Sequence, residues 1–326
     1  MTISRRALVA ALAATPAAAL LPRRVHAAGY PDKPIFLIVP FAAGGNADIV
    51  ARLVGAEIGR VLGQNVVIEN RGGAGGAIGA EYVARAAADG YTLLAGSNGP
   101  LTVNPFVHPR LGYDPLKDFA PIALTSYVPH ALVMSSKSGA KTFADALSQS
   151  RTAALAISTS GVGSATHMTL ERLKAATGAN ITHVPYKSGG QMVPDLIGGE
   201  VSGAMTELST ALPLHRDGKA VIVAVAAARR ARLAPDIPTF DEAGVKGFSG
   251  QSFVGILAPA ATPADIIAKL QTAVATSLAP GASAAERLAD LGAELGSAEQ
   301  MTAKGFGDFI RADYEAMREA ARLAGI

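Results

Sequence analysis

Short apolar segments alternate with segments of helical periodicity along nearly all of this 326-residue chain. The apolar segments lack strict alternation, as is typical of strands buried on both faces. After Asp48, Val50, Val54 and Ile58 recur at helical spacing. Such an order predicts an α/β fold with parallel layers. The expected strands are 35–39, 66–69, 91–95, 154–158, 181–184, 201–206 and 221–226, and the expected further helices are 80–88, 165–176, 191–197, 263–278 and 299–323.

Four glycine-containing loops, 43–45, 96–99, 161–163 and 188–190, directly follow expected strands. The carboxyl edge of the strands is where open α/β sheets bind ligands. Glycine lets backbone approach a ligand, and a helix beginning behind the loop offers unpaired N–H groups to an anion. Any one loop can be an ordinary turn. Four of them together predict a site that binds a carboxylate without needing an arginine.

The N-terminus has the three regions of a secretory signal: Arg5 and Arg6, an apolar run over 9–21, and small residues ending at Ala27. The arginine pair suggests the Tat route, although the same regions satisfy Sec. A membrane anchor is the alternative, but a largely apolar run of 13 residues falls short of the roughly 20 that span a bilayer. We therefore expect export to the periplasm, cleavage near Ala27 and no direct membrane insertion.

The basic excess of the chain lies in this leader. The whole sequence has 29 basic and 26 acidic residues, and 1–27 holds four arginines and no acid, so the remainder has 25 and 26. A mature net charge of −1 gives no basic footprint, and no nucleic-acid partner is expected. The chain has no cysteine, which excludes disulfides and thiolate chemistry.

The sequence approaches some enzyme motifs but completes none of those described below. The segment 73–78 approaches the dinucleotide fingerprint but has Ile78 where the last glycine belongs. Lys219 follows Gly218 without the upstream glycine of a phosphate loop, and neither a Gly-x-Ser-x-Gly elbow nor a His-Glu-x-x-His pair occurs. The histidines are scattered singly, without metal-ligand spacing. We expect no catalytic residue, no cofactor and no metal.

Several motifs carry a resemblance to a known family. They are 30–35 (YPDKPI), 39–45 (VPFAAGG) with Asp48, 69–76 (ENRGGAGG), 89–94 (DGYTLL), 104–105 (NP), 113–119 (YDPLKDF), 183–187 (HVPYK) and 257–259 (LAP). In this order they resemble the Bug family, the extracytoplasmic solute-binding receptors of tripartite tricarboxylate transporters. The resemblance covers nearly the whole mature chain.

The resemblance implies a type II periplasmic-binding-protein fold, in which two α/β lobes enclose a ligand cleft. Lobe one would comprise 28–126 and 251–326, and lobe two 127–250. The protein would act as a monomer that captures a small organic carboxylate by lobe closure. Its protein partners would be the membrane permease subunits of a tripartite tricarboxylate transporter.

The family's site residues, transferred position by position, fall in the loops described above. Lobe one would contribute side chains and amides after the first and third strands, and lobe two would contribute the loops after three further strands. The predicted ligand-binding residues are Phe41, Gly44, Gly45, Asn46, Asp48, Ser97, Asn98, Ser160, Gly161, Gly163, Ser164, His167, Tyr186, Lys187, Gly189, Thr206 and Glu207.

Individual assignments have structural alternatives. Asp48 can serve only the positive end of its helix, a contribution of about 0.3–1 kcal/mol. Lys187 can lie solvated at the rim, and Tyr186 can belong to the core as well as to a pocket wall. His167, one turn into the helix behind the 161–164 loop, stays open as a ligand-binding residue.

The sequence departs from the family pattern after the strand 201–206. Many members have Phe-Asp-Asn where this chain has Met205, Thr206 and Glu207. An ionised Glu207 facing the pocket would repel a second ligand carboxylate and suit an amine, hydroxyl or cation. The alternative is that Glu207 caps the next helix and faces solvent.

Two other functions stay open. A ligand-sensing receptor for a sensor kinase uses the same lobe closure as a transport receptor, so sequence does not separate them. A secreted hydrolase would need a nucleophile with a base in reach, and the serines near glycine belong to no recognisable triad.

Overall fold

The computed structural model describes residues 29–108 and 110–324, with side chains up to Glu319. The expected signal peptide, 1–27, and its cleavage site lie outside the described residues. The described residues from Pro31 onward form one compact unit. Over the described ranges, no helix is both long and apolar enough to cross a membrane.

The first half of the fold is a sheet in which β1 (Ile35–Val39) lies between β2 (Val66–Asn70) and β3 (Thr92–Gly96), all parallel. β9 (Gln251–Pro259) joins β3 in the antiparallel direction. The helices of this half are α2 (Asn46–Leu62), α3 (Ala77–Ala84), α4 (Asn104–Val107), α9 (Ala264–Ser277), α10 (Ser283–Asp290) and α11 (Ala303–Ala324).

The second half is built around β5 (Leu155–Thr159), which pairs in parallel with β6 (Ile181–Pro185) and β7 (Gly203–Glu207). β8 (Ala220–Val225) completes this sheet through an antiparallel pairing with β4. Its helices are α5 (Phe143–Thr152), α6 (Ala165–Thr177), α7 (Val193–Gly198) and α8 (Leu208–Arg216).

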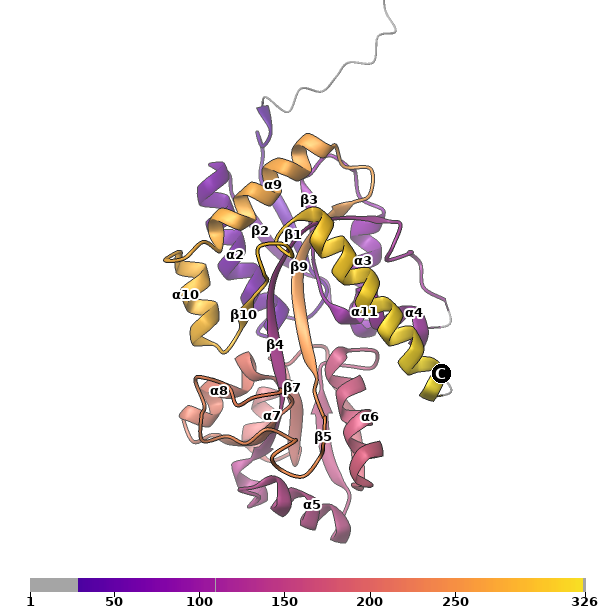
Figure 1. The fold of residues 1–326 in the computed structure, drawn as a ribbon, viewed down its shortest axis with the longest axis vertical. Coiled ribbons are helices and arrows are strands. Elements are labelled where there is room, and N and C mark those ends of the chain that lie inside the picture. Colours follow the sequence, from indigo (N-terminus) through magenta and orange to yellow (C-terminus); the bar gives the residue numbers. More distant parts are fainter. Residues whose placement is uncertain (1–28, 109, 325–326) are drawn as a thin grey trace, which may run out of the picture. The chain divides into compact units, whose positions relative to one another are not determined.

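Two long strands connect the halves. β4 (Phe119–Ser135) pairs with β9 from Phe119 to Pro129 and with β7 and β8 from His130 to Ser135. Figure 1 shows β4 and β9 side by side, passing from one group of helices and strands to the other. The short β10 (Glu294–Leu295) also pairs with β4. The chain therefore crosses between the two halves on paired strands and not on a flexible linker.

Each half has its own apolar core, as a lobe requires. One core combines Ile38 and Leu94 with Phe253 and Phe306, residues far apart in sequence. The other core consists of residues between 132 and 248, including Phe240. The expected two-lobed α/β fold is confirmed, whereas the boundaries at 126/127 and 250/251 stay a prediction.

The seven expected strands all exist, with ends displaced by at most two residues. Burial on both faces is wrong for β2 and β6, since these lie at the two ends of the strand order and remain partly exposed. The expectation of parallel layers holds within each lobe, but β4 and β9 run antiparallel to their neighbours. Their pairing depends on residues about 130 positions apart, which local periodicity does not report.

Candidate functional site

A cavity lies where the strands of both lobes end, beside the crossing strand β9; we call it the lobe cavity. Its volume is about 400 Å³ when the solvent space at its opening is included. Among its lining residues the polar side chains are hydroxyls, one amide and one carboxyl, and none is basic. The lining residues are Phe41, Gly45, Asn46, Ala47, Ser97, Gly99, Ser160, Ser164, Ala165, Ser188, Gly189, Glu207, Ser252 and Val254.

The N-terminus of α2 reaches the cavity through Gly45, Asn46 and Ala47. Gly44 adopts φ +83°, a left-handed conformation that favours glycine, and its N–H donates to Asp48 Oδ2 at 2.9 Å. The N-cap residue Gly45 has no side chain to cap the helix. The first-turn amides of α2 are thus not capped from within the helix and can donate to a group in the cavity.

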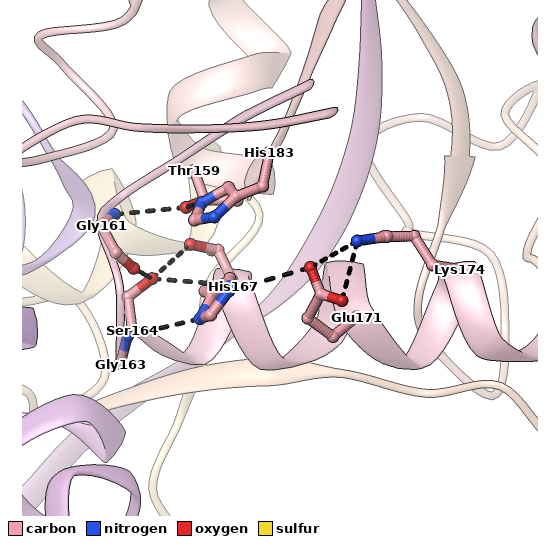
Figure 2. A network of polar contacts seen from close by, with 9 residues as sticks. Thr159, Gly161, Gly163, Ser164, His167, Glu171, Lys174 and His183 are labelled. Atoms are coloured by element: carbon pink, nitrogen blue, oxygen red, sulfur yellow. Dashed lines mark hydrogen bonds and ion pairs between the residues drawn. The ribbon is translucent and has the colours of Figure 1, made fainter. Parts of the chain in front are cut away.

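The N-terminus of α6 reaches the cavity from the other lobe. Ser164 is its N-cap: the hydroxyl donates to the Gly161 carbonyl at 2.7 Å and accepts from the His167 N–H at 3.2 Å, as Figure 2 shows. Gly161 has φ +115°, and a Cβ there would lie 2.7 Å from the Tyr186 carbonyl oxygen. The glycine is therefore needed for the turn that carries Ser160 and Ser164 to the cavity.

Loops of the two lobes touch beside the cavity. The Ala42 N–H donates to the Lys187 carbonyl at 3.2 Å, and Ser209 Oγ donates to Asn46 Oδ1 at 2.9 Å. Gly190 packs so closely that a Cβ there would lie 2.5 Å from the Gly44 carbonyl carbon. The two helix N-termini are therefore held facing a common space.

Glu207 lies at the end of β7 and is buried, 8% exposed. Ser252 Oγ donates to its Oε1 at 3.0 Å, and Thr206 Oγ1 donates to its Oε2 at 3.3 Å. The alternative that Glu207 faces solvent and caps α8 with its side chain is wrong. Burial raises the pKa of this carboxyl and outweighs the hydrogen bonds that oppose the shift. Burial therefore shifts the protonation equilibrium of Glu207 towards the neutral form relative to an exposed glutamate.

Of three predicted residues, Asp48 and Lys187 follow their structural alternatives, whereas Tyr186 is only partly buried and belongs neither to the core nor to the cavity lining. Burial alone would raise the pKa of Asp48, but hydrogen bonds from Arg52, Gly44 and Asn70 outweigh it and hold the pKa below its usual value. Lys187 is exposed. The Tyr186 hydroxyl donates to Asp195 Oδ2 at 2.5 Å. None of these three side chains lines the lobe cavity.

Asn98 is buried but does not line the lobe cavity, although its neighbours Ser97 and Gly99 do. Its Oδ1 accepts from the Phe253 N–H at 2.9 Å, and its Nδ2 donates to Asp313 Oδ2 at 3.3 Å. It thus connects the end of β3 to β9 and α11. It lines a second, larger hollow between α6 and α11, as does His167.

His167 and His183 stack with ring centroids 4.2 Å apart, as Figure 2 shows. The Gly163 N–H donates to His167 Nδ1 at 3.4 Å, and Thr159 Oγ1 contacts His183 Nε2 at 2.7 Å. Burial lowers the pKa of both rings, that of His183 to about 4, with His167 as the next cause. Through these contacts the two rings hold the 159–164 loop in place, and neither ring lines the lobe cavity.

Sequence reasoning named eight of the lining residues and missed six: Ala47, Gly99, Ala165, Ser188, Ser252 and Val254. Ser188 stands in one of the glycine loops, so loop membership would have found it. Ser252 and Val254 lie on β9, and no local signal connects that strand to the cavity. Of the other predicted residues, Gly44, Gly161, Gly163 and Thr206 adjoin the cavity without lining it. Within residues 29–319, no cluster of histidine and acidic side chains suits a metal.

A space of this kind, between two lobes joined by paired strands, belongs to proteins that enclose a small solute. Residues 50–315 match the model of the tripartite tricarboxylate transporter family receptors. Protein BugT of Bordetella pertussis is 36% identical over 249 residues, 76% of each chain. The chain therefore belongs to this receptor family, and the expected Bug-family membership is confirmed.

Solved structures agree. MatC from Rhodopseudomonas palustris with bound malate is 34% identical, with a TM-score of 0.84 over 90% of this chain and 100% of that one. A second R. palustris protein, with adipate, is 35% identical, with a TM-score of 0.86 over 91% and 99%. The family and these neighbours are solute-binding proteins.

Proposed function

We propose that this protein captures a small organic carboxylate in the lobe cavity and delivers it to the membrane subunits of a tripartite tricarboxylate transporter. The observation that carries this proposal is the pair of helix N-termini, of α2 and α6, that reach one cavity from opposite lobes. Helix N-termini bind anions through unpaired amides and the positive end of the dipole. The relatives with malate and adipate support the same ligand class.

In this proposal the carboxylate is held without an arginine. Amides of Gly45–Ala47 and the hydroxyls of Ser97 and Ser160 would satisfy its oxygens, and Ser164 would join them by turning its hydroxyl from the Gly161 carbonyl to the ligand. Lobe one (28–126 with 251–326) and lobe two (127–250) would separate to admit the ligand and close on it, because each carries part of the site. The separate apolar cores support this division.

The same proposal includes export to the periplasm with removal of the leader near Ala27, action as a monomer and absence of catalysis. The charged, apolar and small-residue order of 1–27 supports export. The matching family model, which describes transporter receptors, and the structural neighbour BugD, a periplasmic binding protein, support the absence of catalysis.

A thermal-shift screen tests the proposal. Purified residues 28–326 are heated with a panel of small carboxylates, matched alcohols and amides. One carboxylate class should raise Tm, since a ligand at 100 times its Kd adds about 2.7 kcal/mol. Gly45→Val should abolish the shift, because the branched side chain would meet Gly189 and Ser188, both within 3.3 Å of its Cβ. Hydrolysis of an ester library without any stabilising carboxylate would contradict the proposal.

A further inference from the structure

Glu207 is a carboxyl group in the lobe cavity that has no cation beside it. It is 8% exposed, and within residues 29–319 no basic side chain forms an ion pair with it. Proteins rarely bury a carboxyl group without pairing or neutralising it, since an isolated buried charge is costly. Something outside the described chain is needed to balance the charge if the group ionises.

The neighbours of Glu207 are arranged to donate to it. Ser252 donates to Oε1 and Thr206 to Oε2, so each carboxyl oxygen has a hydroxyl donor. An ionised carboxylate accepts through both oxygens, as this arrangement allows, whereas a protonated acid would also need an acceptor for its O–H. The immediate surroundings therefore suit the charged form, while burial opposes it.

A chain of hydrogen-bonded side chains leads from Ser252 away from Glu207. His130 is buried, pairs with Glu207 across β4 and β7, and its Nε2 lies 2.8 Å from Ser252 Oγ. Its Nδ1 lies 2.8 Å from Thr169 Oγ1. Burial lowers the pKa of His130 to about 3, so the ring carries one proton. With that proton on Nε2, Thr169, His130 and Ser252 each donate to the next, and the chain ends on Glu207.

An unused acceptor lies close by. Thr210 Oγ1 is buried and has no hydrogen-bond partner among the described residues. It flanks the same face of Gly189 as Glu207 Oε2, each 3.4 Å from where a Cβ on Gly189 would stand. A buried hydroxyl without a partner costs stability unless a ligand or water satisfies it.

We infer that the ligand carries a protonated amine as well as its carboxylate, and that Glu207 is the specificity-determining residue that pairs with this ammonium group. The inference rests on the proposed function and deepens it to one substrate class, the amino-substituted carboxylates. The ammonium would supply the missing counter-charge and donate to Glu207 and to nearby hydroxyl oxygens. The carboxylate would occupy the helix N-termini of α2 and α6.

The test compares ligands that differ in one group. Calorimetry is run with 4-aminobutyrate, 4-hydroxybutyrate, pentanoate and glutarate, and with the corresponding shorter and 2-amino series. In the best series, wild-type protein should prefer the amine at least about tenfold, and Glu207→Gln should weaken amine binding about 30-fold or more while leaving the methyl analogue nearly unchanged. Glu286→Gln, on an exposed acid of α10, is the matched control and should behave as wild type.

A second measurement does not depend on a variant that folds. Burial raises the pKa of Glu207, so at pH 5 a larger share of the empty protein should carry a proton on Glu207 than on an exposed glutamate, and pairing with an ammonium should ionise it. Titrations in two buffers of different ionisation enthalpy should therefore show proton release with the amine and none with its methyl analogue. His130, the titratable side chain connected to Glu207 through Ser252, stays neutral at this pH.

The outcomes are distinguishable. Wild type that binds the dicarboxylate as tightly as the amine, with the same ratio in Glu207→Gln and no proton release, would overturn the inference and leave carboxylate capture intact. Tight binding of dicarboxylates that Glu207→Gln weakens would mean that a neutral acid donates to the ligand, which also overturns it. Failure of every carboxylate to bind would instead refute the proposed function.

Discussion

Contact between the loops of the two lobes is predicted to be necessary for tight binding, and Gly190→Ala tests it. A Cβ at Gly190 would lie 2.5 Å from the carbonyl carbon of Gly44 and 2.7 Å from its Cα and oxygen, where ordinary contact begins at 3.4 Å. The shortfall is about 0.9 Å against backbone, which cannot rotate away. Gly190 itself has no positive φ, so the added methyl group causes no strain within its own loop.

Overpacking of this kind costs about 1–3 kcal/mol, which corresponds to a loss of about 5- to 150-fold in affinity. The cost should fall on the closed form alone, because separated lobes relieve the contact. Isothermal titration with the carboxylate that most raises Tm should show this loss, while the Tm of the empty protein stays close to that of wild type.

Gly198→Ala is the matched control, since its Cβ would meet nothing nearer than Glu200 at 3.8 Å. Equal affinities for the two variants would refute the role of the loop contact in binding. A fall in the Tm of empty Gly190→Ala equivalent to its loss of affinity would show that the contact stabilises the fold as a whole and is not specific to the closed, ligand-bound form.

Three further predictions concern the supporting residues. Burial lowers the pKa of His183 to about 4 from an ordinary 6.5, so the unfolded chain takes up a proton at a higher pH than the folded protein does. Tm should therefore fall as pH decreases from about 6.5 to 4, and it should fall less in His183→Gln. Identical pH profiles of Tm for the two proteins would contradict this role of His183. Ser164→Ala should cost about 0.5–2 kcal/mol in urea unfolding through loss of the α6 cap, besides weakening carboxylate binding; unchanged stability would refute the capping role. Asn98→Ala should destabilise the protein by about 1–3 kcal/mol, because it removes the hydrogen bonds to Phe253 and Asp313, and it should leave the ligand preference unchanged. A changed ligand preference would show that Asn98 contacts the ligand.

Local sequence patterns were sufficient to predict many residues of the site. Glycines at 44, 161 and 189 mark sharp turns and close approaches between strands and helices, and such turns are encoded within a few residues. The N-cap Ser164 belongs to the same local code. These local signals are sufficient to predict where α2 and α6 begin.

Side-chain roles were decided by tertiary structure, because they depend on partners distant in sequence. Asp48 and Asn98 lie at the expected loops, but Asp48 is hydrogen-bonded to Asn70 and Asn98 to Asp313, so both have structural roles. Ser252 enters the cavity only because β9 crosses between the lobes beside β4. Glu207 was recognisable as a departure in sequence, but its burial beside Ser252 and His130 required the assembled sheet. Composition and local periodicity thus determined the elements and turns of this protein, whereas the environment of each polar group followed from long-range strand pairing.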